Sequence, residues 1–317
     1  MSDARLAGIA AVTTTAVLWG TTGTAATFAP DAGPLAIGAA ALGIGGLLQA
    51  LVAVPALRAA VVQLRTQAGT VLLGAVAVFV YPLAFYSSMH LAGVAVGSVI
   101  SLASAPLAAG VLERVVDGRR LGRWWAAAAT TGVVASVLLC LSSFTTASSA
   151  TPIGIGLGLL AGAAYAGYSW AAHRLMSRGV ARSAAMGSVF GGGGLLLLPV
   201  LVITGGPLIA STTSFAVAAY MALIPMFLGY LLFGFGLTKV SPTVATTITL
   251  TEPAVATVLA VIVVGESLSA TSWVGLGLFA VVLAMLAVAP SPPEPADELR
   301  DAAKSRSVPN PDAAALP

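Results

Sequence analysis

Long apolar stretches alternate with short polar segments along most of this chain. Ten of them come near the length of about 20 residues that an α-helix needs to cross a bilayer. They lie near residues 5–28, 33–54, 68–88, 93–112, 121–141, 152–172, 183–204, 214–236, 242–263 and 270–289. The segments between them are too short to hold a soluble catalytic domain. We therefore predict an all-α membrane protein with ten transmembrane helices.

The Lys and Arg residues fall into alternate connections between these stretches. With the N-terminus in the cytoplasm, all 14 of them lie in segments on the cytoplasmic side. The segments near 29–32, 89–92, 142–151, 205–213 and 264–269 contain none. Because cytoplasmic loops of membrane proteins are enriched in Lys and Arg, the pattern predicts a multi-pass protein of the cell membrane with both termini cytoplasmic.

The two halves of the chain share punctuating residues at nearly one spacing. An offset of 147 residues aligns Pro106 with Pro253, and an offset of 146 places Trp19-Gly20 opposite Tyr165-Ala166. A repeat of five helices is odd-numbered, so the second copy must enter the membrane in the opposite direction. We predict two inverted five-helix repeats, residues 1–145 and 146–289; a chance alignment of helices rich in Ala, Val, Leu and Gly is the alternative.

The connections that follow the two aligned prolines differ in charge. Residues 113–123 hold four Arg, whereas residues 260–270 hold only Glu266 as a charged residue, as cytoplasmic and external versions of one loop would. Residues 290–317 change to Pro, Ala and mixed charge. Such a composition cannot bury a core, so we predict a disordered cytoplasmic tail there.

Composition argues against several functional classes. Charged residues make up only 8% of the chain, against about 25% in soluble domains. One cysteine and two histidines are too few for an internal disulfide or a conventional zinc site, so we expect neither a metal nor another cofactor. The basic residues are spread over short loops rather than gathered in one patch, which argues against a nucleic-acid partner.

A run of glycines at 191–194 precedes four leucines and lacks the Lys-Ser/Thr of a phosphate-binding loop. It indicates close helix packing instead. With no ATP site in the sequence, transport would be driven by a gradient or would run downhill.

One acidic residue, Glu252, lies near the middle of the ninth apolar stretch and is followed by Pro253. An ionised carboxylate at this depth is costly unless it meets a partner, a cavity or a proton. Pro253 removes a backbone donor and frees carbonyl groups at the same depth. The pair favours an ion- or substrate-handling site, with Glu252 as a proton carrier or as the ligand of a cationic group. A structural acid hydrogen-bonded to Thr249, Thr251 or a neighbouring helix is the alternative.

Aromatic side chains with a polar tip are suited to line a substrate cavity next to Glu252. The candidates are Trp19, Tyr81, Tyr86, Tyr165 and Tyr230. Tyr165 and Tyr230 lie deeper in their stretches and are the stronger of them. Pro106 and Pro253 are candidate hinges at paired helix breaks, and a tolerated kink explains each proline equally well.

These residues resemble a known family. The segment 251–269, TEPAVATVLAVIVVGESLS, is similar to the closing Glu-Pro helix and Gly-Glu loop of EamA-type transporters in the drug/metabolite transporter superfamily. Weaker similarity is found in AVLWG at 16–20, in FYSSMHLAGVAVGSVISLASAP at 85–106 and in LLFGFGLTKVSPTVATT at 231–247. The resemblance implies inverted five-helix repeats around a central cavity and export of amino acids, metabolites or drugs. Ala105 stands where Glu252 stands in the second half, so Glu252 alone can be an intramembrane coupling acid.

We therefore predict a secondary transporter and not an enzyme, with the lipid bilayer and a small-molecule substrate as its partners. Its halves would alternate access to a midplane cavity, and Glu252 would exchange a proton or bind an amine. A membrane-embedded enzyme acting on lipid, or a scaffold or sensor that does not transport, are the alternatives. Helix faces of small residues serve internal packing and dimerisation alike, which leaves a homodimer open.

Overall fold

The computed structural model describes residues 3–92, 94–118, 121–142, 152–259, 262 and 270–288. Every element in these ranges is a helix, which agrees with the predicted all-α class. Glu266 and the predicted tail at 290–317 lie outside the described residues. Six segments have the length and hydropathy to cross a membrane: Asp3–Ala26, Pro34–Val52, Ala68–Ala92, Gly97–Val116, Arg182–Thr204 and Thr212–Leu237. The chain is a multi-pass membrane protein; ten crossings and the orientation of the termini stay predictions.

Six of the predicted stretches are single, continuous helices within the described ranges. They are α7 (Ala68–Ala92), α8 (Val94–Val116), α9 (Arg123–Ser142), α10 (Pro152–Ser177), α11 (Arg182–Thr204) and α16 (Ala270–Val288). Glycines in the left-handed conformation follow two of them, Gly118 (φ 67°) after α8 and Gly179 (φ 86°) after α10. A side chain at such a φ is strained, so glycine is the residue that ends a helix there.

The other four stretches change helical geometry part-way. The first is α1 (Asp3–Gly20) and α2 (Thr22–Ala26), and the second is α3 (Pro34–Gly38), the π-helix η1 (Ala39–Ile44) and α4 (Gly45–Val52). The eighth is α12 (Thr212–Met221), the π-helix η3 (Ala222–Leu228) and α13 (Gly229–Leu237). The ninth is α14 (Pro242–Ile248), the 3₁₀ turn η4 (Thr249–Thr251) and α15 (Glu252–Leu259). Short helices α5 (Val54–Ala59), α6 (Val61–Thr66) and η2 (Gly206–Ile209) complete the described chain.

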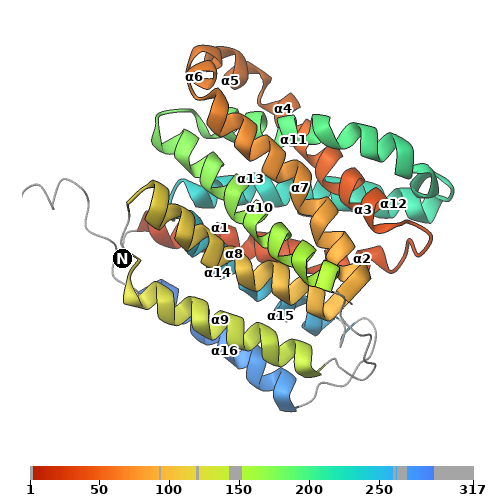
Figure 1. Cartoon of the computed structure of the whole chain (residues 1–317), viewed down its shortest axis with the longest axis vertical. Coiled ribbons are helices and arrows are strands. Elements are labelled where there is room, and N and C mark those ends of the chain that lie inside the picture. The colour runs from red at the N-terminus through yellow and green to blue at the C-terminus, as the bar shows by residue number, and fades with distance from the viewer. Residues whose placement is uncertain are drawn as a thin grey trace, which may run out of the picture.

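The two halves of the chain pack against each other in a reciprocal pattern (Figure 1). Helix α1 of the first half lies on α13, α14 and α15 of the second, and α10 of the second half lies on α7 and α8 of the first. Helices α4 and α11 pair across the halves, as do α9 and α16. Each half therefore inserts its first helix between elements of the other.

The glycine run at 191–194 allows α11 to approach its neighbours closely. A methyl group on Gly193 would overlap the side chain of Val78 in α7, and one on Gly191 would overlap Ala50 in α4. This arrangement agrees with the packing role that the sequence indicates for the run, because small residues let helix backbones meet.

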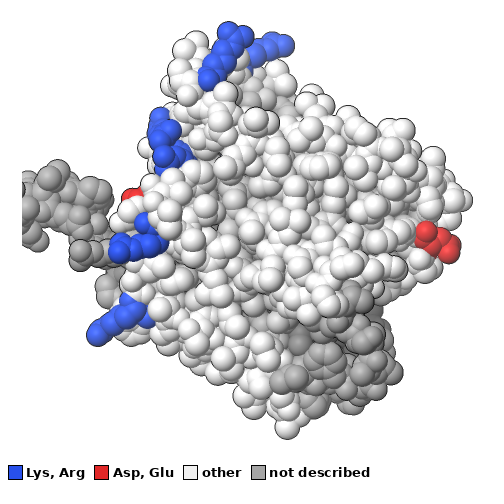
Figure 2. All heavy atoms as spheres, viewed as in Figure 1, with Lys and Arg blue, Asp and Glu red and all other residues white. Residues whose placement is uncertain are grey.

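Lys and Arg side chains gather along one edge of the molecule (Figure 2). We call this edge the basic end. The end of α8, the start of α9 and the end of α10 lie there and carry Arg114, Arg123 and Arg174. The described part of the Lys and Arg distribution thus follows helix termini, as the sequence pattern requires.

Candidate functional site

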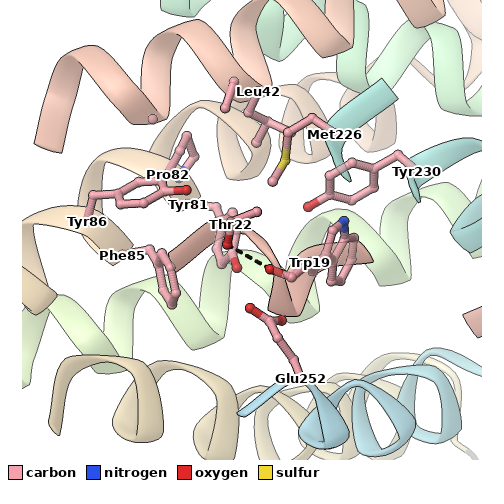
Figure 3. A pocket seen from close by; sticks show the side chains of 12 residues that line it. Trp19, Thr22, Leu42, Tyr81, Pro82, Phe85, Tyr86, Met226, Tyr230 and Glu252 are labelled. Carbon is pink, nitrogen blue, oxygen red and sulfur yellow. Dashed lines mark hydrogen bonds between the residues drawn. The ribbon is translucent and has the colours of Figure 1, made fainter. Parts of the chain in front are cut away.

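A small cavity lies among α1, α7, the two π-helices and the start of α15 (Figure 3). Five of the six predicted substrate-binding residues line it: Trp19, Tyr81, Tyr86, Tyr230 and Glu252. These residues come from four predicted helices in both halves of the chain. The structure therefore brings together side chains that are as much as 233 residues apart in sequence (from Trp19 to Glu252).

Most of the helices that line the cavity depart from regular α-geometry near it. Trp19 and Thr22 flank the junction of α1 and α2, Leu42 belongs to η1, and Met226 belongs to η3. The 3₁₀ turn η4 immediately precedes Glu252, whereas α7 continues across Pro82. Such π- and 3₁₀ segments inside helices recur at functional sites.

The cavity is narrow. The space open to the centre of a water molecule is about 20 Å³, which is room for roughly one water. A metabolite therefore fits only when the surrounding helices move apart.

The carboxyl group of Glu252 points into this cavity (Figure 3). Its oxygen Oε2 is buried and makes no hydrogen bond within the described part of the chain. The nearby threonines do not serve it, because the Thr249 hydroxyl donates to the Thr246 carbonyl (3.0 Å) and the Thr251 hydroxyl donates to the Ile248 carbonyl (2.8 Å). The described residues therefore do not form a structural acid bonded to Thr249 or Thr251.

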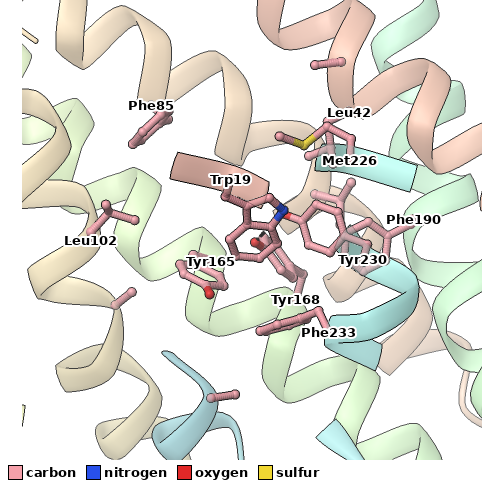
Figure 4. Close-up of a cluster of buried hydrophobic side chains, with 14 of the residues drawn as sticks. Trp19, Leu42, Phe85, Leu102, Tyr165, Tyr168, Phe190, Met226, Tyr230 and Phe233 are labelled. Atoms are coloured by element: carbon pink, nitrogen blue, oxygen red, sulfur yellow. Dashed lines mark hydrogen bonds between the residues drawn. The ribbon is translucent and has the colours of Figure 1, made fainter. Parts of the chain in front are cut away.

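Behind the cavity lies a layer of packed aromatic rings (Figure 4). The Trp19 ring centroid is 4.7 Å from that of Tyr230 and 5.9 Å from that of Tyr165. Tyr165 is fully buried and does not line the cavity, in contrast to the expectation for it. Its hydroxyl lies 2.7 Å from the hydroxyl of Thr249 instead. Tyr165 is thus placed to hold η4, the turn that immediately precedes Glu252.

Trp19 and Gly20 join α1 to the second half of the chain. The Trp19 indole N–H donates to the carbonyl of Pro225 at 2.9 Å. Pro225 lies inside the π-helix η3. Gly20 packs against α15, where an added Cβ atom would lie 2.7 Å from the Val255 Cβ. The Trp-Gly pair therefore combines a polar tie with a close approach that only glycine permits.

The two candidate hinge prolines have different surroundings. Helix α8 continues across Pro106, so the first half contains no assigned break at this residue. Pro253 occupies the first turn of α15, directly after η4, where a missing backbone N–H costs little. Of the paired breaks that the sequence suggests, the structure contains the one at Pro253.

A polar cluster at the basic end was not foreseen from the sequence. Asp117, just after α8, accepts a hydrogen bond from the Trp170 indole (2.7 Å) and forms an ion pair with Arg174, both in α10. Glu113 of α8 is buried and accepts from the backbone N–H (3.0 Å) and hydroxyl (3.1 Å) of Thr243 in α14. These contacts join the first half of the chain to two helices of the second.

Comparison with known proteins identifies the family. Residues 152–288 match the model of the EamA-like transporter family. An uncharacterized transporter of Bacillus subtilis (strain 168), YwfM, is 36% identical over 279 residues, which cover 87% of this chain and 92% of the relative. The chain belongs to the EamA-like transporter family.

A crystal structure of another protein has the same fold as this EamA-like chain. Its TM-score is 0.72 at 18% identity, and the alignment covers 90% of this chain and 96% of the other. The family assignment supports a transporter of the drug/metabolite type. It does so independently of the cavity, because the family match rests on sequence.

Several residues of this EamA-like protein line the cavity without having been predicted, among them Thr22, Leu42, Pro82, Phe85 and Met226. Pro82 and Phe85 stand between Tyr81 and Tyr86 in the sequence, and a proline flanked by two tyrosines within an apolar stretch is a usable signal. Leu42 and Met226 carry no such signal, because their roles depend on two π-helices meeting.

Proposed function

We propose that this protein is a secondary active transporter that exports a small metabolite or amino acid from the cell by alternating access. The cavity is the substrate site, and Glu252 is the coupling acid that exchanges a proton. The observation that carries the proposal is the Glu252 carboxyl group, which faces an aromatic cavity with one buried oxygen unpartnered among the described residues. A buried carboxylate in that position needs a proton or a cation.

The reciprocal packing of the two halves supports the inverted repeats that this mechanism uses. Helix α1 lies against the ninth stretch as α10 lies against α8, which is the relation a two-fold axis in the membrane plane produces. Rocking of one half against the other would widen the narrow cavity toward one side at a time. Export is the direction that family resemblance favours.

The polar cluster at the basic end fits a closed cytoplasmic side in this mechanism. Asp117 and Glu113 join α8 to α10 and α14, so opening that end requires these bonds to break. Loss of a hydrogen bond to a charged group costs about 1.5–3 kcal/mol. This is enough to shift the equilibrium between the closed and open forms of the transporter.

Proton flux in proteoliposomes that enclose a pH-sensitive dye tests the proposal. We expect at least one member of a panel of amino acids, amines and nucleosides to drive proton movement through the wild-type protein. Glu252→Gln is expected to lower this flux by about tenfold or more, because the amide cannot release a proton. Asp31→Asn, an exposed carboxylate in the α2–α3 connection, is the control and should leave the flux unchanged.

Two results would contradict parts of the proposal. Substrate-driven flux that persists in Glu252→Gln removes Glu252 as the coupling acid and leaves transport in place. Absence of flux and of uptake with the whole panel favours the alternative of a scaffold or sensor.

A further inference from the structure

Among the described residues that line the cavity, Glu252 is the only acidic or basic one, and the charge that it takes when ionised is negative. Among the described residues, the ionisable groups around Glu252 are otherwise tyrosines, namely Tyr81, Tyr86, Tyr165 and Tyr230. A guest that brings a carboxylate or a phosphate would meet no counter-charge there, and it would be repelled by Glu252 in a medium of low dielectric.

Most hydrogen-bond donors of the cavity wall are already engaged. The Trp19 indole donates to the Pro225 carbonyl at 2.9 Å, and the Thr22 hydroxyl donates to the Trp19 carbonyl at 2.7 Å. The Tyr230 hydroxyl is paired with that of Tyr168 at 2.7 Å. An anionic group needs several donors, and among the described side chains of this wall it finds mainly the hydroxyls of Tyr81 and Tyr86.

Among the described side chains, the cavity wall offers more hydrogen-bond acceptors and aromatic ring faces than unengaged donors. The ionised Glu252 carboxyl group only accepts hydrogen bonds, and the hydroxyls of Tyr81 and Tyr86, which can donate or accept, line the same space (Figure 3). An ammonium group has three donors and no acceptor, which is the complement of this set. Aromatic rings attract cations within about 6 Å of their centroids. Leu42 and Met226 supply apolar contact for the rest of a guest.

We propose that the cavity selects amine cations with an aromatic or apolar body and no carboxylate, and that it discriminates against the corresponding amino acids. The inference rests on the proposed function of the cavity and narrows its substrate class. The ammonium would bind Glu252 and the tyrosine hydroxyls, and its body would lie against the aromatic wall. Binding then competes with protonation of Glu252.

Matched ligand pairs test the inference directly. Phenethylamine and phenylalanine differ by one carboxylate, as do tryptamine and tryptophan, and their binding to the purified full-length chain is measured by calorimetry and thermal shift. We expect each amine to bind about tenfold or more tightly than its amino acid, since a hydrogen bond to a charged group has about this effect on Kd. Amine affinity should increase as the pH is raised, because the ammonium binds the ionised form of Glu252.

Glu252→Gln separates the substrate class from the proposed function. In this variant, amine binding should weaken about tenfold and lose its pH dependence, while Asp31→Asn behaves as wild type. If the amino acids bind as tightly as the amines or more tightly, the proposal that the cavity selects amines is wrong. If Glu252→Gln then weakens the binding of both ligands, the cavity is still supported as the substrate site. Amine binding unaffected by Glu252→Gln, or no amine binding at millimolar concentration, also overturns the inference. The proton-flux assay with the broad panel then decides separately whether the protein transports.

Discussion

Helix α8 and the α14–η4–α15 segment occupy corresponding places in the two proposed repeats, and each contains a proline. Helix α8 passes through Pro106 unbroken, with the fully buried Ala105 before it. The second segment changes to a 3₁₀ turn and then places Glu252 and Pro253 at the start of a new helix. A proline alone therefore does not break a helix here. The break accompanies a run of threonines that bond back to their own chain.

The surroundings of the two segments differ as well, because one is closely packed and the other lines the cavity. Helix α8 is tightly packed on α10, where a methyl group on Gly162 would overlap the Ser104 hydroxyl. The second segment faces the cavity and is held by the Tyr165–Thr249 hydrogen bond. One copy of the helix is a packing element and the other lines the cavity, so the two halves contribute different residues to it.

Moving the acid to the first half should have the largest effect on stability. Ala105→Glu places a carboxyl group in a fully buried position of α8, and an uncompensated buried charge costs about 3 kcal/mol or more. We expect a large drop in melting temperature, measured by thermal unfolding in detergent. Ala105→Gln controls for side-chain size, and stability like that of wild type in Ala105→Glu would mean that α8 has room for an acid.

Closing the gap at Gly20 should have the next largest effect. Gly20→Ala brings a Cβ atom to 2.7 Å from the Val255 Cβ and 3.0 Å from the Glu252 carbonyl oxygen, and overpacking of this kind costs about 1–3 kcal/mol. We expect lower stability together with weaker substrate binding. Gly23→Ala, with no atom within 4 Å of the added Cβ, is the matched control and should change neither.

The aligned residue in the second half sharpens this contrast. Gly20 corresponds to Ala166 at the offset of 146 residues, and Ala166 is fully buried beside α7 and α8 without needing a glycine. At this aligned position, α10 accommodates the methyl group of Ala166, whereas α1 has no room for one at Gly20.

Replacing the two prolines should separate their roles. Pro106→Ala restores a backbone donor inside a continuous helix, and we expect the free energy of unfolding to rise by about 1 kcal/mol. Pro253→Ala adds a donor in the first turn of α15, where it gains little, but it allows η4 to relax toward α-geometry. Substrate-driven flux should fall several-fold in Pro253→Ala and change little in Pro106→Ala; equal losses in both would contradict the asymmetry.

The smallest expected effect concerns the support of η4. Tyr165→Phe removes the hydroxyl that bonds Thr249 and should lower stability by about 1 kcal/mol. Because η4 positions Glu252, we also expect a shift in the pH profile of transport. Tyr168→Phe, which removes the bond to Tyr230, should lower stability to a similar extent without shifting that profile.

Much of the architecture can be read from the sequence because its physical causes are local. Helix-length apolar stretches predict the helices, and the carboxyl group of Glu252 has to be accommodated wherever the ninth stretch packs. The position of Tyr165 could not be read in this way. Depth in a stretch does not tell whether a ring faces a cavity or lies behind Trp19.

Other features depend on contacts between distant helices. The π-helices η1 and η3 line the cavity side by side, and no local pattern in Ala39–Ile44 or Ala222–Leu228 predicts this geometry. The same holds for the basic-end cluster, in which Asp117 finds its partners in α10. Charge counts assign these residues to a loop and say nothing of their pairing.

The narrowness of the cavity has a consequence for affinity. A site with about 20 Å³ of free space is filled only in those molecules whose walls have separated. The apparent Kd is the intrinsic Kd divided by the fraction of such molecules, so a tenfold rarer open form weakens binding about tenfold. Weak apparent affinity follows, and it suits a carrier that has to let go of its cargo in every cycle.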